Sequence, residues 1–208
     1  MSNLLTPTLL AELVCTRISH DIVGNVGAVA NAVELLEEGD LDFLDDIKSI
    51  LKTSSGVLSA RMKFFRLAFG LDNANLENLA MIKSAAEDYL ATIGNRNYPI
   101  KLDFSLTDVR YARIVLLAVM IIADTLIRGG NISVAEKDGQ VWVVSQGDVP
   151  PSVDKLACLK QIVGGQNIEP NAQLAPVFYL LAELSAKGSK VFMVNSNFAG
   201  FMFASDKD

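Results

Sequence analysis

Apolar positions in the first 70 residues recur every three or four residues, and this spacing predicts two long helices. The first helix is expected to begin near Pro7, which suits the first turn, and to end at Gly39, which suits a C-terminal cap. Asp40 is the expected N-cap of the second helix, which ends at Gly70. The two apolar stripes are Val14, Ile18, Ile22, Val26, Val29, Val33 and Leu36, and then Leu44, Ile47, Leu51, Leu58, Met62, Phe65 and Phe69.

The turn between the two helices is short, which predicts an antiparallel hairpin. Two helices alone cannot bury stripes of this length, so a second hairpin is needed to cover them. Another copy of the same chain is the simplest source of that hairpin. We therefore expect a homodimer in which residues 8–70 of two chains form a four-helix bundle.

The pattern changes after residue 75, where short strands and helices follow one another. Strands are expected at 100–106, 132–135, 140–145, 191–194 and 200–204, and helices at 76–92, 108–127, 153–163 and 175–186. Asp138-Gly139 is a strong hairpin signal. The order lacks the alternating strand–helix rhythm of a Rossmann fold and predicts an α+β layer with helices on one face of the sheet. We divide the chain into a hairpin domain, residues 1–72, and a second domain, residues 73–208.

Composition and charge exclude several classes of protein. Of the 208 residues, 50% are apolar and 20% are charged, which is typical of a folded globular protein. The longest apolar run, 114–123, is too short for a membrane-spanning helix of about 20 residues, and no secretory signal is visible, so we expect a cytoplasmic protein. The net charge is -6, without a basic cluster, which disfavours nucleic acid as a partner. Cys15, Cys158 and one histidine are too few for a disulfide framework or a four-ligand zinc site, so we expect no metal or cofactor of its own.

His20 is the only histidine in the chain. At about 100° per residue it lies roughly 200° from Ile18 and Ile22, so it points outward when those two face the core. Residues that share its face are Thr16, Gly24, Gly27 and Asn31. Each helical glycine costs about 1 kcal/mol relative to alanine, which suggests that this face needs clearance. A partner that approaches from outside and a closely packed neighbouring helix both explain the glycines, and a surface histidine without function is the simplest alternative.

An exposed imidazole is suited to carrying a phosphoryl group, because it is largely neutral at pH 7 and keeps a nucleophilic lone pair. Asp21 follows His20 directly and can orient one ring nitrogen while supporting the positive charge that develops as the other attacks phosphorus. Phosphoryl transfer also needs a metal ion, and the chain offers no carboxylate cluster for Mg²⁺. We therefore expect the partner to supply the Mg²⁺.

Residues 15–22, CTRISHDI, followed by VGAV at 26–29 and NAVELL at 31–36, resemble the histidine box of the ChpT-type histidine phosphotransferases of alphaproteobacterial phosphorelays. The resemblance implies a dimerising hairpin followed by a degenerate, histidine-kinase ATPase-like α/β sandwich. It also implies that His20 takes a phosphoryl group from the receiver-domain aspartate of a hybrid histidine kinase and hands it to response regulators. One departure is Asn25, where many kinases carry a proline, and this predicts a straighter first helix.

A receiver that reaches His20 is expected to dock on both helices. With the turn near 39–40, antiparallel pairing places His20 level with Ser59. The docking candidates are Thr16, Arg17, Gly24, Gly27 and Asn31 on the first helix and Ser55, Ser59, Met62 and Arg66 on the second, with Arg66 facing an acidic receiver surface. Ordinary solvated helix surface is the alternative for these residues, or core in the case of Met62.

A working kinase would need nucleotide-binding motifs in the second domain. The apolar helix that ends with IADTLI, residues 122–127, contains no asparagine for Mg²⁺, and residues 145–149, SQGDV, lack an Asp-x-Gly-x-Gly motif. The chain has no Gly-x-Gly sequence at all, so a phosphate loop of that kind is absent. ATP-dependent kinase activity is therefore disfavoured. The remaining alternative to phosphotransfer is a non-catalytic dimeric scaffold, or pseudokinase, that binds signalling partners.

Overall fold

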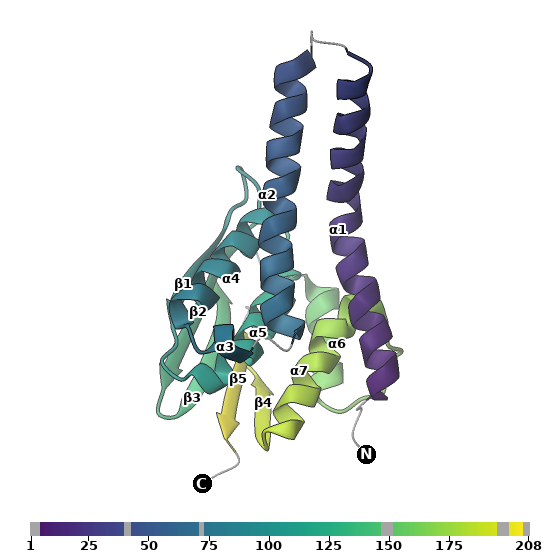
Figure 1. The fold of residues 1–208 in the computed structure, drawn as a ribbon. Helices are drawn as coiled ribbons and strands as arrows, with labels where there is room; N and C mark the ends of the chain where they lie inside the picture. Colours follow the sequence, from purple (N-terminus) through teal and green to yellow (C-terminus); the bar gives the residue numbers. More distant parts are fainter. Residues whose placement is uncertain (1–4, 40–42, 71–72, 147–151, 195–199, 206–208) are drawn as a thin grey trace.

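The computed structural model describes residues 5–39, 43–70, 73–146, 152–194 and 200–205. Its N-terminal part is a hairpin of two long helices, α1 (Pro7–Glu37) and α2 (Leu44–Phe69). The remaining elements form the second domain, from which the hairpin projects (Figure 1). Among these described ranges, no helix combines the length and hydropathy needed to cross a membrane.

The ends of α1 follow from local sequence, as expected. The Thr6 hydroxyl accepts a hydrogen bond from the Leu9 amide at 3.3 Å, and Pro7 occupies the first helical position. Gly39 follows the helix with φ +77°, a left-handed conformation that glycine adopts without strain. Asp40, the expected N-cap of the second helix, lies outside the described residues.

The second domain is a five-stranded mixed sheet with helices, which confirms the predicted α+β class. Its elements are α3 (Asn73–Leu76), α4 (Leu79–Ile93), β1 (Ile100–Ser105), η2 (Val109–Tyr111), α5 (Ala112–Ala123), β2 (Gly130–Lys137), β3 (Gln140–Gln146), α6 (Val153–Val163), η3 (Ala172–Leu174), α7 (Ala175–Ala186), β4 (Ser189–Met193) and β5 (Gly200–Ser205). The strand order is β1-β2-β3-β5-β4. Among the strands of the described residues, β1 and β2 pair in parallel and the other neighbours pair antiparallel.

Turn chemistry explains two details of this sheet. Asp138 and Gly139 both have positive φ, 53° and 72°, which is the type I′ hairpin turn that the sequence predicts between β2 and β3. The predicted helix 108–127 is shorter in the structure, where α5 ends at Ala123. The chain turns directly after α5, where the Leu126 amide donates to the Ala123 carbonyl. Gly129 then has φ +68°, which does not continue a helix.

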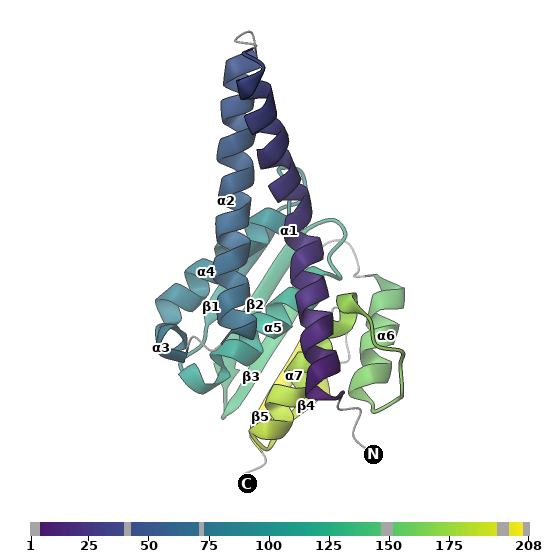
Figure 2. The same cartoon turned by 45° about the vertical axis from the view of Figure 1, so that its right-hand side comes forward.

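The core lies between the sheet and the hairpin, and α5 fills its centre. Every residue of α5 except Arg113 is buried. The sheet contributes Ile132, Val134, Val141, Val143, Phe201 and Phe203, all at most 1% exposed. Helices α4, α5 and α7 cover the sheet face directed toward the hairpin, as Figures 1 and 2 show. This arrangement makes the second domain a rigid base for one end of the hairpin.

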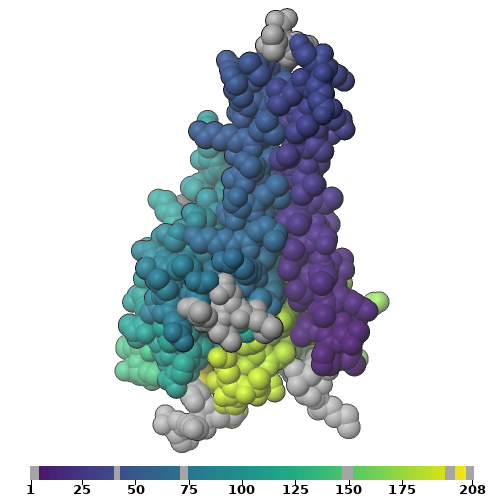
Figure 3. Space-filling view, in the orientation of Figure 1, coloured from purple at the N-terminus to yellow at the C-terminus, as the bar shows by residue number. Residues whose placement is uncertain are grey.

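Aromatic stacking and hydrogen bonds fasten α2 to that base. Phe64 stacks on Tyr89 of α4 with ring centroids 4.0 Å apart. At the end of α2, Arg113 donates to the Gly70 carbonyl at 2.7 Å and Tyr179 donates to the Phe69 carbonyl at 3.4 Å. The other end of the hairpin stands clear of the second domain (Figure 3).

The apolar stripes are covered unevenly as a result. Val14 is buried, whereas Val26, Val33 and Leu36 farther along α1 are 50%, 43% and 41% exposed. Small side chains such as Ala32, 1% exposed, make the contact with α2 in that region. Met62, which is expected in the apolar stripe of the second helix, is 50% exposed. The side chains that α2 buries in this region are instead those of Phe64 and Phe65.

Candidate functional site

His20 projects from α1 near the junction with the second domain. Its side chain is 83% exposed, as the helical phase predicts. The side chain of Asp21 is only 15% exposed and places Oδ1 3.7 Å from His20 Nδ1. This distance is within ion-pair range but longer than a hydrogen bond, so the carboxylate acts on the ring through its charge. The ring is therefore largely open to solvent, while Nδ1 lies near the Asp21 carboxylate.

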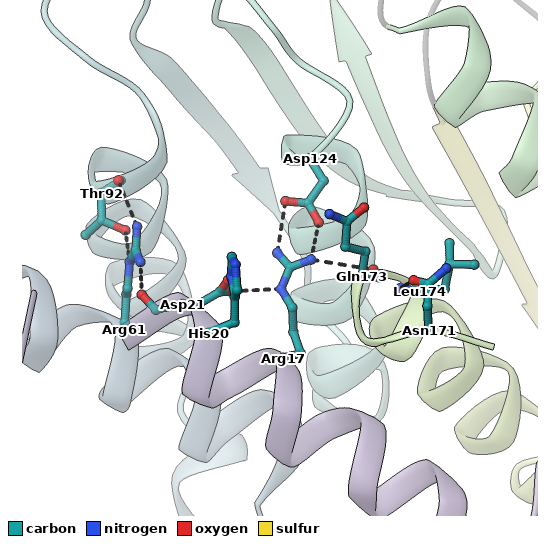
Figure 4. Close-up of polar contacts among 9 residues, drawn as sticks. All are labelled: Arg17, His20, Asp21, Arg61, Thr92, Asp124, Asn171, Gln173 and Leu174. Carbon is teal, nitrogen blue, oxygen red and sulfur yellow. Dashed lines mark hydrogen bonds and ion pairs between the residues drawn. The ribbon is translucent and has the colours of Figure 1, made fainter. Parts of the chain in front are cut away.

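Arg17 differs from its expected place on the docking surface. It is 8% exposed, and its guanidinium bridges two carboxylates, donating to Asp21 Oδ2 at 2.9 Å and forming a bidentate pair with Asp124 at 2.9 and 3.1 Å (Figure 4). A further contact, at 3.5 Å, reaches the Gln173 carbonyl. Arg17 is therefore turned away from a docking partner, because its helical phase aims it at the second domain.

The charges around Arg17 favour its protonated form. Burial by itself would lower the pKa of the Arg17 guanidinium, but the carboxylates of Asp124 and Asp21 together raise it above its ordinary value. Both carboxylates therefore favour the charged form of the Arg17 guanidinium. The two carboxylates, in turn, have a permanent cation between them.

A second arginine holds α1 from the other side. Arg61 of α2 donates to the Asp21 backbone carbonyl and, through Nε, to the Thr92 hydroxyl at 3.1 Å (Figure 4). Its other terminal nitrogen donates to the Thr92 carbonyl at 3.3 Å. This contact places Asp21 beside Arg61. The sequence predicts that His20 is level with Ser59, so the observed pairing of the two helices differs from the predicted one by a few residues. No local pattern in the sequence points to Arg61, because its partners Asp21 and Thr92 lie on two other helices, α1 and α4.

A groove of about 530 Å³ opens beside His20, between α1 and one end of the second domain. Its lining comes from α1, the end of α5, α6, and the η3–α7 segment. The lining residues are Thr16, Arg17, His20, Asp21, Ile121, Asp124, Thr125, Asp154, Lys155, Cys158, Leu159, Asn171, Ala172, Gln173, Leu174 and Val177. The predicted residues Thr16 and His20 thus share a surface with α6 and η3 residues that lie more than a hundred positions away in the sequence, and no local pattern points to those.

The other candidates on α1 lie where the helical phase placed them. Gly24, Gly27, Asn31 and Thr16 are exposed. A Cβ added at Gly24 or Gly27 would meet nothing within 4 Å, so close packing within the chain does not explain either glycine. The Thr16 hydroxyl donates to the Glu12 carbonyl at 2.8 Å. This face of α1 is open to an approaching surface.

The four candidates on α2 also lie on an exposed face. Ser55, Ser59, Met62 and Arg66 are spaced by three or four residues and all are exposed. Met62 is thus surface rather than core. Their contact with a docked receiver stays a prediction.

Among the described residues, no group of three or more histidine, cysteine, aspartate or glutamate side chains is placed to hold a metal ion. Asp124, at the end of the helix where a kinase would carry its Mg²⁺-binding asparagine, is already paired with Arg17. Its carbonyl also accepts a hydrogen bond from Lys155. Arg17 and Lys155 thus place positive charge at the position where a kinase would hold Mg²⁺.

Known proteins resemble this chain over part of its sequence and in its fold. No family model matches the chain. The protein phosphotransferase ChpT of Brucella abortus (strain 2308) is 42% identical over an alignment of 79 residues, and the match covers 34% of this chain and 37% of that protein. The matched segment thus spans little more than a third of the relative's length.

Solved structures extend the similarity to the whole fold. A bacterial phosphotransferase superposes with a TM-score of 0.75 at 24% sequence identity, covering 96% of this chain and 97% of that one. The Acinetobacter baumannii histidine kinase AdeS is more distant, with a TM-score of 0.41 at 13% identity over 91% of this chain and 98% of that one. The chain therefore resembles ChpT in sequence over part of its length and shares its overall fold, a hairpin followed by a mixed five-stranded sheet, with the solved structure of a bacterial phosphotransferase.

Proposed function

We propose that this protein is a histidine phosphotransferase that carries a phosphoryl group on His20 between receiver-domain aspartates. The observation that carries the proposal is the geometry of His20, the only histidine, which is 83% exposed with a carboxylate 3.7 Å from Nδ1. The similarity to ChpT supports the same chemistry. The donor is the receiver of a hybrid histidine kinase, the acceptors are response regulators, and the setting is the cytoplasm, as the sequence predicts.

The reaction is a transfer between two nucleophiles. His20 Nε2 attacks the phosphorus of the aspartyl phosphate, a P–N bond forms, and the P–O bond to the receiver aspartate breaks, which returns that aspartate as a carboxylate. Asp21 supports the positive charge that the ring acquires in this step. The Mg²⁺ that neutralises the phosphoryl oxygens belongs to the receiver. Transfer to the next receiver is the same step in reverse.

The open face of α1 gives the receiver room to bring phosphorus into line with His20. Reacting atoms must approach to about 3–3.5 Å, and a side chain at Gly24 or Gly27 would hold the receiver away. A Gly24→Leu variant is expected to fold and to transfer about a hundredfold more slowly, since a displacement of about 1 Å is enough for such a loss. A Gly24→Leu protein with the native transfer rate would contradict the clearance role.

Arg66 is proposed to meet an acidic patch of the receiver. The variant Arg66→Glu is expected to raise the receiver concentration needed for half-maximal transfer, and more so at low salt, because rim charges act on encounter. Arg128→Glu, an equal charge change on an exposed residue of the second domain, is the control. Equal effects of the two variants would assign the loss to net charge rather than to docking.

We also propose that the protein works as a homodimer through its hairpin. Apolar side chains remain exposed on both helices away from the second domain, among them Val26, Val33 and Ile50. A second hairpin would cover them in a four-helix bundle, as the sequence predicts. Sedimentation that shows a monomer at micromolar concentration would contradict this assembly.

The second domain is proposed to bind no ATP. The absent motifs support this, and so does Asp124, whose carboxylate is occupied by Arg17 rather than free for a metal ion. Isothermal titration calorimetry with Mg-ATP is expected to show no binding below millimolar concentration. A sub-millimolar dissociation constant, or autophosphorylation with labelled ATP, would overturn this part of the proposal.

Transfer itself is tested with radiolabelled, phosphorylated receiver domains and Mg²⁺. We expect label to appear on the native chain, to be stable to alkali and labile to acid as a phosphohistidine is, and to be absent from His20→Ala. Asp21→Asn is expected to accept label slowly. If no label reaches His20 from any receiver encoded by the same genome, the protein is instead a non-catalytic scaffold for signalling partners.

A further inference from the structure

Arg17 links Asp21, the residue next to His20, to Asp124 of the second domain. It lies one helical turn before Asp21, so both side chains leave the same face of α1. The guanidinium uses Nε for Asp21 and its two terminal nitrogens for Asp124. With 8% of the residue exposed, little water competes for these donors. Arg17 is thus held in one orientation by a fork that lysine could not reproduce.

Asp21 divides its two oxygens between Arg17 and His20. Oδ2 accepts from Arg17 Nε at 2.9 Å, and Oδ1 is the atom 3.7 Å from His20 Nδ1. A carboxylate is planar, so fixing one oxygen also fixes the direction of the other. Without Arg17, the Asp21 side chain would be free to rotate away from the ring.

Asp124 anchors this chain of contacts in the rigid part of the second domain. It follows directly on α5, the fully packed central helix, and is 107 positions from Arg17. Its own carbonyl is held by Lys155 of α6. Arg17 and Asp21 thus form a continuous series of contacts from Asp124 to His20.

We propose that Arg17 and Asp124 are positioning residues for phosphoryl transfer, so that the second domain, without any nucleotide, aligns the Asp21 carboxylate with His20. This inference rests on the proposed function. It gives the second domain a direct part in the reaction that takes place on the hairpin. The expected consequence is a loss of maximal transfer rate, with receiver binding unchanged, when the Arg17–Asp124 pair is broken.

The chain supplies a matched control for the stability that such a pair contributes. Arg113 pairs with Glu183 at 3.2 Å, with side chains 12% and 21% exposed, and Arg113 also donates to Gly70 at the end of α2. This second pair likewise belongs to the junction of hairpin and second domain. Neither of its members lines the groove beside His20.

The experiment compares Asp124→Asn and Arg17→Lys with Glu183→Gln in the full chain. Single-turnover transfer from a phosphorylated receiver is measured over a range of receiver concentrations, together with the thermal midpoint of each variant. Asp124→Asn and Arg17→Lys are expected to lower the maximal rate at least about tenfold with little change in the half-saturating receiver concentration. Glu183→Gln is expected to lower the thermal midpoint similarly and to keep the native rate.

A second readout does not depend on transfer. Because His20 is the only histidine, the ring ¹⁵N signals of labelled protein belong to it alone. The share of the tautomer protonated at Nδ1, which faces Asp21, is expected to fall in Asp124→Asn and Arg17→Lys and to stay native in Glu183→Gln. Native rates and native tautomer signals in Asp124→Asn would overturn the inference, as would equal rate losses in all three variants.

The two readouts separate this inference from the proposed function. If the native chain accepts no phosphoryl group, the proposed function fails. The tautomer signals then still report whether Asp124 acts on His20. If transfer occurs but neither its rate nor the signals respond to Asp124, phosphotransfer stands and the positioning role is wrong.

Discussion

The two ends of the hairpin are built from the same kind of helix and are covered in opposite ways. The proximal part, residues 7–22 and 61–70, packs on the second domain and buries Arg17, Phe64 and Phe65. The distal part, residues 23–39 and 43–56, buries mainly Ala32, Ile47 and Ser54 between its own helices. It leaves a set of large apolar side chains exposed, namely Val23, Val26, Val33, Leu35, Leu36, Phe43 and Ile50.

This difference separates two sources of stability along one pair of helices. The proximal part obtains its contacts from its own chain, including aromatic stacking and paired charges. The distal part has apolar surface to offer to another molecule, which is typical of an association site. His20 lies at the boundary, where a rigid support meets an open surface, and this is a suitable place for a group that must be fixed and still accessible.

The largest expected effect comes from removing the central contact of the proximal part. Phe64→Ala deletes a fully buried ring that stacks on Tyr89 and is expected to lower the free energy of unfolding by about 3–5 kcal/mol. Chemical denaturation followed by circular dichroism measures it. Phe64→Leu, which keeps most of the volume, should lose much less. A loss below about 1 kcal/mol for Phe64→Ala would show that the proximal part does not depend on this packing.

The distal part is tested by placing a charge on its exposed apolar surface. Val33→Lys is expected to weaken the dimer about a hundredfold, or about 2.7 kcal/mol, because a lysine would have to be desolvated in the bundle. Sedimentation equilibrium measures the dissociation constant. Ala11→Lys adds the same charge to an exposed proximal position and should leave the dimer unchanged. Equal weakening by both variants would place the dimer contact elsewhere.

Tyr89 makes the proximal part sensitive to alkaline pH. Burial, and next the charge of Asp124, raise the pKa of its hydroxyl, which has no hydrogen-bond partner among the described residues. Above about pH 10 the unfolded chain loses this proton while the folded chain retains it, so stability should fall by about 1.4 kcal/mol per pH unit.

The variant Tyr89→Phe should reduce that slope, and it is not expected to destabilise the protein at pH 7, because it removes an unpaired buried hydroxyl. Denaturation curves between pH 8 and 11 measure both effects. Tyr98→Phe, at a 44% exposed position, should keep the native slope. A native slope in Tyr89→Phe would mean that Tyr89 is not the titrating group.

The smallest expected effect concerns the glycines of the distal part. A Cβ at Gly24, Gly27 or Gly56 would meet nothing within 4 Å, so each change to alanine should raise the free energy of unfolding by up to about 1 kcal/mol. At Gly70, in the proximal part, a Cβ would collide with the Arg66 carbonyl, and Gly70→Ala should destabilise. Thermal unfolding compares the four variants. Destabilisation by Gly24→Ala would reveal a close neighbour from a second chain.

Local sequence determined those parts of the molecule that depend on neighbouring residues. The helical period places His20 outward, Pro7 and Gly39 bound α1, and Asp138-Gly139 forms the predicted turn with both φ values positive. In each case, the residue's own backbone preference, or its angle around a helix, is sufficient. For the same reason the glycines beside His20 are in the expected place.

Only the tertiary structure decided which surfaces meet. The sequence predicts Arg17 only as a docking residue, because its partner Asp124 is 107 residues away and no local pattern connects the two. The exposed half of the apolar stripe, ending at Leu36, differs from the buried half only in what lies opposite it. Periodicity tells which face of a helix is apolar, whereas the element that covers this face is chosen by long-range packing, and the positioning of Asp21 beside His20 depends on that choice.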